Sequence, residues 1–220
     1  MPSSRKHREL NQVKETFEVL EKEHGIDFFN YKDEKDPYYV LISCILSLRT
    51  KDEVTYPAAK RLFKVAKTPE EMLKISVAKI QKLIYPVGFY KRKSHTILGI
   101  SRKLVEEYES KVPDTIDELL KFKGVGRKTA NIVVTFAYRK HGIAVDVHVN
   151  RICNRIGWIK TRTPDETEAE LRKKLPRKYW IPLNELLVKH GQRICKPISP
   201  FCSKCPISKY CGRVGVERHR

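Results

Sequence analysis

The chain has 220 residues, of which 45 are Lys or Arg and 26 are Asp or Glu, and its formal net charge is +19. Such a surplus of positive charge indicates a polyanionic partner, most often nucleic acid. A highly charged surface of the kind found in thermophiles is the alternative, but it would not explain why the charge is mostly positive. The longest apolar run, Tyr38 to Leu48, is shorter than the roughly 20 residues that span a bilayer, and the N-terminal segment lacks the apolar part of a secretory signal, so we expect an intracellular protein without a membrane partner.

Helical patterns follow one another along the chain. An apolar stripe predicts an amphipathic helix over roughly 5–24, and the apolar run after Pro37 predicts a helix buried at the centre of a domain. A further stripe predicts a helix after Gly88, and 181–195 reads as a last long helix that ends at a cysteine. Capping boxes predict three more helix starts, at Thr68, Thr115 and Thr163.

Strand signals are weak. Only 143–147 could form a short strand, and Asp146 would then lie in its middle. We therefore predict an all-α fold in which two helical layers flank a cleft.

Four cysteines close to the C-terminal end form the pattern C-x6-C-x2-C-x5-C: Cys195, Cys202, Cys205 and Cys211. In a reducing compartment they indicate a metal centre rather than disulfides. Structural zinc commonly uses two C-x2-C pairs, and only one is present, so we favour a [4Fe-4S] cluster and keep zinc as the alternative. With all four positions held by cysteine, the centre would be structural, and Lys196 in its first loop would grip a phosphate. Cys44 and Cys153 are interpreted as small core residues.

The segment KGVGRKTA, residues 123–130, lies between two helical patterns. It fits neither a Walker loop nor a dinucleotide fingerprint, because the glycine spacing differs from both. A helix, a tight glycine turn and a second helix would present backbone N–H groups to a DNA phosphate without reading the sequence. An ordinary helix–helix turn is the alternative, but it leaves Arg127 and Lys128 without a role. Asp146, eighteen residues after Lys128, is predicted to cap a helix and to be held in its charged form there.

The order of three motifs, L-x-x-F-x-GVGRKTAN, VDVHVNR-x-x-NR and C-x6-C-x2-C-x5-C, resembles endonuclease III, the iron–sulfur branch of the helix–hairpin–helix DNA glycosylases. The resemblance covers about Tyr38 to Cys211 and suggests an archaeal or thermophilic type of sequence. It implies a bifunctional DNA glycosylase and abasic-site lyase for oxidised pyrimidines, with Lys128 as the Schiff-base lysine and Asp146 as the catalytic aspartate. Its partner would be double-stranded DNA with damaged bases or abasic sites, bound by a monomer in the cytoplasm, at the nucleoid.

The resemblance also implies two domains. A six-helix barrel with the helix–hairpin–helix would span 28–137, and a discontinuous cluster domain would combine 1–27 with 138–220, with Lys128 and Asp146 facing the cleft. The lysine amine attacks C1′ only when neutral, and we expect partial desolvation and Arg127 to favour that form.

Flipping a nucleotide out of the duplex leaves a gap, which family members fill from two loops, here 46–52 and 87–93. Arg49 stands where many bacterial relatives have glutamine, which bears on the preference for the opposite base, and Phe89 is either a wedge or a core residue. The DNA contacts that we predict are Gly124, Val125, Gly126, Arg127, Arg49, Phe89, Lys93, Lys196 and His148. Two other functions remain open: a mismatch-specific thymine or uracil glycosylase, and a non-catalytic DNA-binding iron–sulfur protein.

Overall fold

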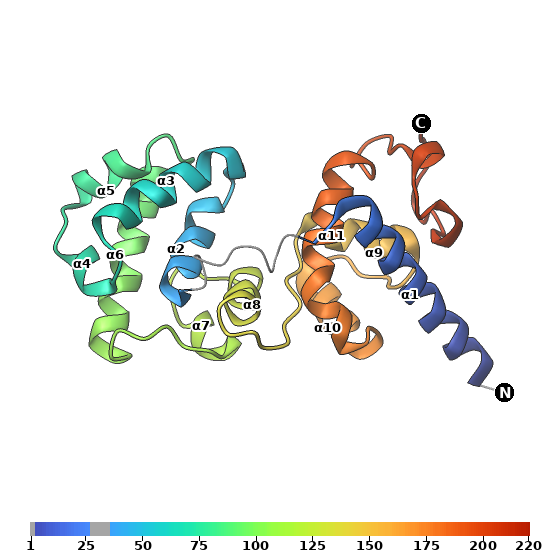
Figure 1. Ribbon diagram of the computed structural model, residues 1–220, viewed down its shortest axis with the longest axis horizontal. Helices are drawn as coiled ribbons and strands as arrows, with labels where there is room; N and C mark the ends of the chain where they lie inside the picture. Colours follow the sequence, from blue (N-terminus) through green and yellow to red (C-terminus); the bar gives the residue numbers. More distant parts are fainter. Residues whose placement is uncertain (1–2, 27–35) are drawn as a thin grey trace. The chain divides into compact units, whose positions relative to one another are not determined.

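The computed structural model describes residues 3–26 and 36–220, and every regular element in these ranges is a helix (Figure 1). The chain divides into two compact units, one made of Met1–Asn30 with His141–Arg220 and the other of Tyr31–Lys140. The predicted boundary at 27/28 lies outside the described residues, and the second, predicted at 137/138, falls at 140/141 in the structure. The all-α prediction is confirmed, and 143–146 is an extended connection rather than a strand.

The unit Tyr31–Lys140 is built around a buried helix. Its described helices are α2 (Pro37–Ser47), α3 (Asp52–Val65), α4 (Pro69–Leu73), α5 (Val77–Ile84), α6 (Tyr90–Glu107), α7 (Ile116–Leu120) and α8 (Arg127–Phe136). Seven helices are described in this unit, for which the resemblance implied a six-helix barrel, and two of the seven, α4 and α7, have only five residues each.

Helix α2 is the centre of this unit, as its apolar run predicted. Asp36 caps it by accepting a hydrogen bond from the Tyr39 amide at 2.8 Å, and Pro37 occupies the first turn, where its missing N–H is not needed. Leu41, Ile42 and Leu46 are fully buried, and α3, α6 and α8 pack around the helix. Burial of each such side chain contributes about 1.5–3 kcal/mol, so α2 fixes the positions of the helices that surround it.

All three predicted threonine N-caps are present. The hydroxyls of Thr68, Thr115 and Thr163 accept hydrogen bonds from the amides three residues further on, at 3.2, 3.4 and 3.2 Å. The caps start α4, α7 and α10, and each contributes about 1 kcal/mol.

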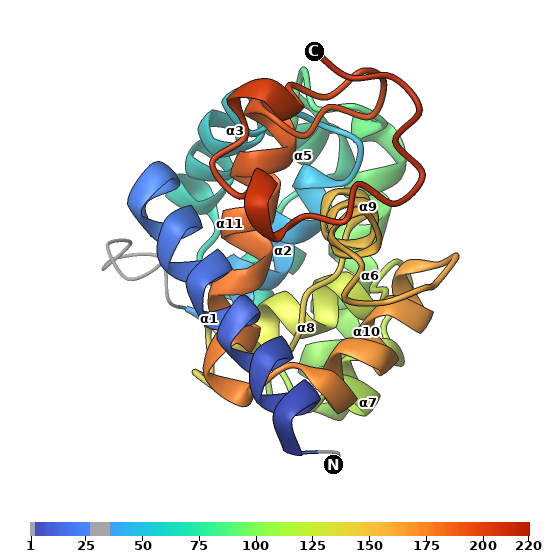
Figure 2. The same cartoon turned by 90° about the vertical axis from the view of Figure 1, so that its right-hand side faces the viewer.

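The other unit contains α1 (Ser3–His24), α9 (Val147–Ile156), α10 (Pro164–Lys174), α11 (Trp180–Arg193) and three short 3₁₀ turns, Arg177–Tyr179, Cys202–Lys204 and Ser208–Tyr210. Helix α1 packs along α11, which also contacts α9 (Figure 2). Phe17 of α1 stacks on Tyr179 with ring centroids 4.3 Å apart. The last helix ends at Arg193, two residues before the cysteine at which it was expected to end, and leaves Cys195 on the loop that follows.

Candidate nucleic-acid interface and metal centre

The segment KGVGRKTA forms a tight hairpin between α7 and α8, as predicted. Gly124 has a φ of +90°, and a Cβ atom there would lie 2.9 Å from the Thr96 methyl group of α6, so two constraints require glycine. Val125 is buried and donates its amide to the Phe122 carbonyl at 3.0 Å, which closes the turn. Gly126 differs from Gly124: its φ is negative, and a Cβ atom there would meet nothing within 4 Å. The packing of the chain thus explains Gly124 but not Gly126.

Helix α8 begins directly after the hairpin. Gly126 is its N-cap and supplies no capping side chain, so the start of α8 has the character of an anion-binding helix end. Arg127 and Lys128 are the first two residues of the helix; Arg127 is partly buried and Lys128 is exposed. Burial raises the pKa of the Cys44 thiol to about 12, an effect that the nearby Lys128 ammonium partly offsets. Lys128 is thus an exposed residue of α8, a helix that packs against α2.

The two predicted wedge loops lie together at one groove of this unit. The groove is lined by residues of both loops and of the hairpin, among them Leu48, Arg49, Phe89, Lys123 and Gly124. Phe89 is 60% exposed, so the structure excludes its interpretation as a core residue. The Arg49 guanidinium lies 6.0 Å from the centroid of the Phe89 ring. Both residues have positive φ angles, +54° and +58°, which are uncommon outside glycine and occur at sites fixed by their surroundings.

Lys93 requires a correction. It was predicted to contact DNA, but its side chain is buried, with only 6% of the residue exposed. Its ammonium donates to the carbonyls of Leu46 and Leu48 at 2.7 and 2.6 Å and to the Thr50 hydroxyl at 3.1 Å. Burial lowers the pKa of Lys93 to about 8. All three N–H donors of an ammonium are engaged inside the protein, so Lys93 binds the loop rather than a phosphate.

Asp146 caps α9 in the other unit. One carboxylate oxygen accepts hydrogen bonds from the amides of His148 and Val149 at 2.9 and 3.0 Å, and the expected N-cap is confirmed. The segment before it is anchored by Asn184, whose amide donates to the Ala144 carbonyl at 2.9 Å. The two backbone donors therefore hold the Asp146 carboxylate at the start of α9.

His148 is half-buried and belongs to a network that reaches the cysteine loop. Its Nδ1 lies 3.1 Å from an Arg151 guanidinium nitrogen, which donates to the Cys195 carbonyl at 2.8 Å. A Cβ atom at Gly191 of α11 would stand 2.3 Å from the same Nδ1, so only glycine leaves room for the imidazole. His148 therefore helps to attach α9 to α11, and the predicted DNA contact of this residue stays a prediction.

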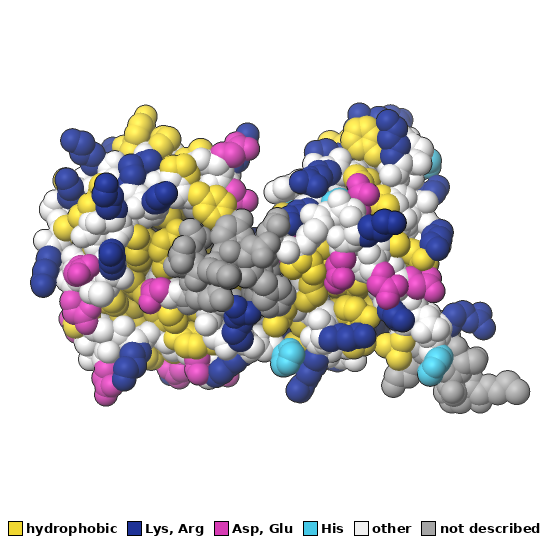
Figure 3. Space-filling view, viewed as in Figure 1, with side chains coloured by type: hydrophobic (Ala, Val, Ile, Leu, Met, Phe, Trp, Pro, Cys, Tyr) yellow, Lys and Arg dark blue, Asp and Glu magenta, His cyan; other side chains and the backbone are white. Residues whose placement is uncertain are grey.

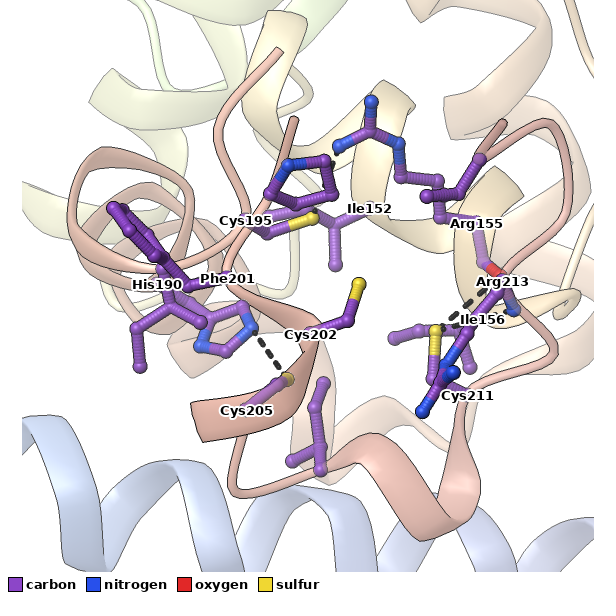
Figure 4. A pocket seen from close by; sticks show the side chains of 14 residues that line it. Ile152, Arg155, Ile156, His190, Cys195, Phe201, Cys202, Cys205, Cys211 and Arg213 are labelled. Atoms are coloured by element: carbon purple, nitrogen blue, oxygen red, sulfur yellow. Dashed lines mark hydrogen bonds between the residues drawn. The ribbon is translucent and has the colours of Figure 1, made fainter. Parts of the chain in front are cut away.

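The four predicted metal-ligating cysteines line one pocket. Cys195, Cys202, Cys205 and Cys211 turn their sulfur atoms toward a common space under the loop after α11 (Figure 4). Cys153 is fully buried in the adjacent core, as predicted, and Cys44 is partly buried in the other unit. The structure thus separates the four cysteines of the motif from the other two.

Nitrogen donors surround these sulfur atoms. Arg155 donates to Cys195 Sγ at 3.3 Å, the Arg213 amide donates to Cys211 Sγ at 3.4 Å, and His190 Nε2 lies 3.6 Å from Cys205 Sγ. Burial raises the pKa of Cys205 to about 11, with the neighbouring cysteines adding to the effect, and raises the pKa of Cys211 as well. Thiols in this setting ionise readily only when a metal centre compensates their charge, and the N–H donors suit the bound thiolates.

Two kinds of metal centre would hold four cysteine sulfur atoms differently. Among the described residues, no three His, Cys, Asp or Glu side chains are placed to hold one metal ion. A tetrahedral zinc site, with Zn–S bonds of about 2.3 Å, would draw the four sulfur atoms to one point. A [4Fe-4S] cluster binds each thiolate through a different iron and keeps them further apart. The four cysteines around one pocket therefore offer thiolate ligands for a metal centre.

The loop between the first two cysteines is held by α9. Arg155 donates to the carbonyls of Lys196 and Pro197, both at 2.7 Å, while the Lys196 ammonium donates to the Gln192 carbonyl. Ile198 at the tip is 86% exposed. Lys196 is thus on a fixed loop beside the pocket, and its contact with phosphate stays a prediction.

The surface carries the charge that the composition predicted. Lys and Arg side chains are spread over the visible face of both units, and Asp and Glu side chains form smaller groups (Figure 3). In the described residues, no helix is both long and apolar enough to cross a membrane.

Comparisons with known proteins agree with these features. Residues 42–177 match the family model of the HhH-GPD superfamily base excision DNA repair proteins. Endonuclease III of Thermotoga maritima is 51% identical over 182 residues, which cover 83% of this chain and 85% of that protein. Endonuclease III homolog 2 of Arabidopsis thaliana is 42% identical over 183 residues, and there the match spans 79% of this chain but only 47% of the longer plant protein.

Solved structures give the same result. The structure of a trapped endonuclease III–DNA covalent intermediate superimposes with a TM-score of 0.79 at 30% identity, covering 91% of this chain and 94% of that chain. A thermostable thymine-DNA glycosylase, at 24% identity and a TM-score of 0.77, shares the fold.

The hairpin, the helical fold and these matches define the class: the chain is a base excision DNA repair protein of the HhH-GPD superfamily. It belongs to the endonuclease III family, and it is a DNA glycosylase with abasic-site lyase activity. The family resemblance seen in the sequence is thereby confirmed.

Proposed function

We propose that this enzyme removes oxidised pyrimidines from double-stranded DNA and cleaves the resulting abasic site through a Schiff base on Lys128. The observation that carries the proposal is the position of Lys128. It is an exposed amine on the first turn of α8, directly after a glycine hairpin suited to a phosphate. The open space at Gly126 leaves room for a DNA backbone to approach closely, which the packing of the chain alone does not require.

The chemistry needs two residues with different roles. The neutral Lys128 amine forms a bond to C1′, the N-glycosidic bond breaks, and the base leaves with a proton. The sugar ring then opens: the C1′–O4′ bond breaks, O4′ takes up a proton, and Lys128 is left joined to C1′ as an iminium. The iminium acidifies the C2′ proton, whose loss expels the 3′ phosphate and breaks the strand. We propose Asp146 as the carboxylate that stabilises positive charge on the sugar and accepts the lysine proton.

The substrate has to leave the base stack before it can react. We propose that Phe89 enters the stack as a wedge and that Arg49 contacts the orphaned partner base. The exposure of the Phe89 ring and the position of both residues at one groove support these roles. We further propose that Gly124, Val125, Gly126 and Arg127 form the phosphate site, that the enzyme acts as a monomer, and that it acts at the nucleoid.

A panel of single-lesion duplexes tests the substrate class. We expect excision and strand cleavage with thymine glycol, cleavage at a preformed abasic site, and little reaction with undamaged DNA or with thymine in a mismatch. Single-turnover gel assays measure each rate. Faster removal of mismatched thymine or uracil than of thymine glycol would instead identify a mismatch glycosylase, and tight binding without turnover on any lesion would identify a non-catalytic protein.

We also propose that Cys195, Cys202, Cys205 and Cys211 hold a [4Fe-4S] cluster. The pocket that they line and the N–H donors around their sulfur atoms support this proposal. The cluster would supply a structural cross-link between α11, the loop and the last 3₁₀ turns. Its ligands leave no open coordination site, so it takes no part in bond breaking.

Replacing Cys202 by serine is expected to remove the brown colour and most of the iron, and to destabilise the unit Met1–Asn30 with His141–Arg220. The physical reason is that the segment after α11 loses the group that would join its four cysteines. Visible absorption, iron analysis and thermal denaturation measure the effect, with Cys153→Ala, a buried cysteine outside the pocket, as the matched control. A colourless wild-type protein that contains one zinc ion would contradict the cluster.

A further inference from the structure

We propose that Lys93 is a positioning residue that joins the two wedge turns, 46–50 and 88–89, into one element that presents Arg49 and Phe89 to DNA together. The inference rests on the proposed function of these two residues, and it adds a role for a buried lysine that touches no DNA.

All three N–H donors of the Lys93 ammonium are used inside the protein. The ammonium of Lys93, which extends from the first turn of α6, reaches the carbonyls of Leu46 and Leu48 and the hydroxyl of Thr50. The two carbonyls lie at the end of α2 and just after it, where a helix leaves carbonyl groups without partners in its own backbone. A lysine here replaces the water or the glycine cap that usually satisfies such groups, and it does so from another helix.

Thr50 connects Lys93 to the second wedge turn, 88–89. The Thr50 hydroxyl that accepts from Lys93 at 3.1 Å also accepts from the Gly88 amide at 3.2 Å. A Cβ atom at Gly88 would lie 3.1 Å from the Arg49 carbonyl and 3.2 Å from the Thr50 hydroxyl, which shows that the two turns are in direct contact. One hydroxyl therefore connects Lys93, the turn that carries Arg49 and the turn that carries Phe89.

This connection maintains an unusual backbone conformation at Arg49 and Phe89. Arg49 lies between Leu48 and Thr50, and Phe89 follows Gly88, so both are next to residues bound in the network. Both have left-handed backbone conformations that residues other than glycine avoid. Such conformations persist when surrounding contacts determine them. Burial of the ammonium lowers the pKa of Lys93 to about 8, which means that the interior disfavours its charged form. Loss of the donors should therefore release both turns together, rather than one of them.

The consequence is specific to one part of the reaction. Expelling a paired base requires the wedge and the partner-base contact at the same moment, whereas an abasic nucleotide has no base to expel. A misplaced wedge should slow lesion excision far more than it slows attack on a preformed abasic site.

The test compares two substrates in Lys93→Met, which keeps much of the side-chain volume but no donor. We expect single-turnover excision of the lesion to fall about a hundredfold, in line with the effect of a small misplacement, and borohydride trapping on abasic DNA to fall less than about threefold. Lys82→Met, which removes an exposed lysine of α5, is the matched control and should match the wild type on both substrates. Equal losses on both substrates, or no loss on the lesion, would overturn the proposal.

A second pair of variants covers the case in which Lys93→Met does not fold. Thr50→Val removes the shared acceptor with little change of shape and should give the same split between substrates, whereas Thr50→Ser keeps the hydroxyl and should restore lesion excision. Hydrogen exchange supplies a readout independent of activity: the Gly88 amide should exchange faster in Thr50→Val and in Lys93→Met. An unchanged Gly88 amide refutes the network, whereas a wild type inactive on every lesion, with the exchange effect present, refutes only the proposed function.

Discussion

Replacement of Lys128 by alanine is expected to abolish the covalent protein–DNA adduct trapped by borohydride and to slow strand cleavage at an abasic site by at least about a thousandfold. The reason is chemical: the imine requires a primary amine at the sugar, and alanine has none. The fold should remain intact, because Lys128 is exposed on the first turn of α8 and alanine favours a helix. Gel assays with borohydride and circular dichroism measure the two effects.

Lys128→Arg separates a nucleophile from a counter-charge. Arginine keeps the positive charge next to the expected phosphate, so binding to abasic DNA should change little, but its guanidinium stays protonated and does not form the imine. Retained binding without trapping would establish the covalent role. If either variant still yields the adduct, another amine is the nucleophile, and mass spectrometry of the cross-linked peptide would identify it.

Much of the fold could be predicted because local patterns determine it. The capping boxes at Thr68, Thr115 and Thr163 place three helix starts, and the apolar run after Pro37 places the buried helix. These signals depend on neighbours a few residues apart, and each contributes on the scale of 1 kcal/mol or more.

The networks around the sites could not be predicted by the same reasoning, although a signal was present. Lys93 lies on the apolar stripe of α6, at helical spacing from Ile97, Ile100 and Leu104. A lysine in such a position means either that the apolar face does not extend that far along the helix, or that the lysine is a buried cation with fixed acceptors. The stripe reveals that the side chain turns inward, but the acceptors come from a different helix end, which only the tertiary structure shows.

His190 is a second buried polar residue on an apolar helix face, in the other unit. It continues the apolar stripe of Leu183, Leu186 and Leu187 on α11, and it is 1% exposed. Its Nδ1 lies 3.1 Å from His24 Nε2, and its Nε2 faces Cys205. Burial lowers the pKa of His190 to about 4. The four cysteines were found from spacing alone, whereas the residues that orient them come from α1, α9 and α11 and share no local motif.

Asp146→Asn is expected to slow base excision by about 10²- to 10⁴-fold while leaving the free energy of unfolding nearly unchanged. The separation is possible because the residue has two roles. As a helix cap, it accepts two backbone hydrogen bonds, and an asparagine oxygen can accept both. As a catalytic group, it needs the negative charge, which asparagine lacks. Single-turnover excision of a thymine glycol duplex and denaturant unfolding measure the two roles.

Asp146→Ala removes both roles and should also cost about 1 kcal/mol of stability. Asp36→Ala is the matched control, because Asp36 caps α2 through the same kind of hydrogen bond, to the Tyr39 amide. It should lower stability by a similar amount without the loss of excision rate. If Asp146→Asn retains full activity, or if Asp36→Ala lowers the rate as much as Asp146→Ala, the carboxylate acts only as a cap. A large rate loss confined to the Asp146 variants would instead show that the charge at the start of α9 serves the reaction.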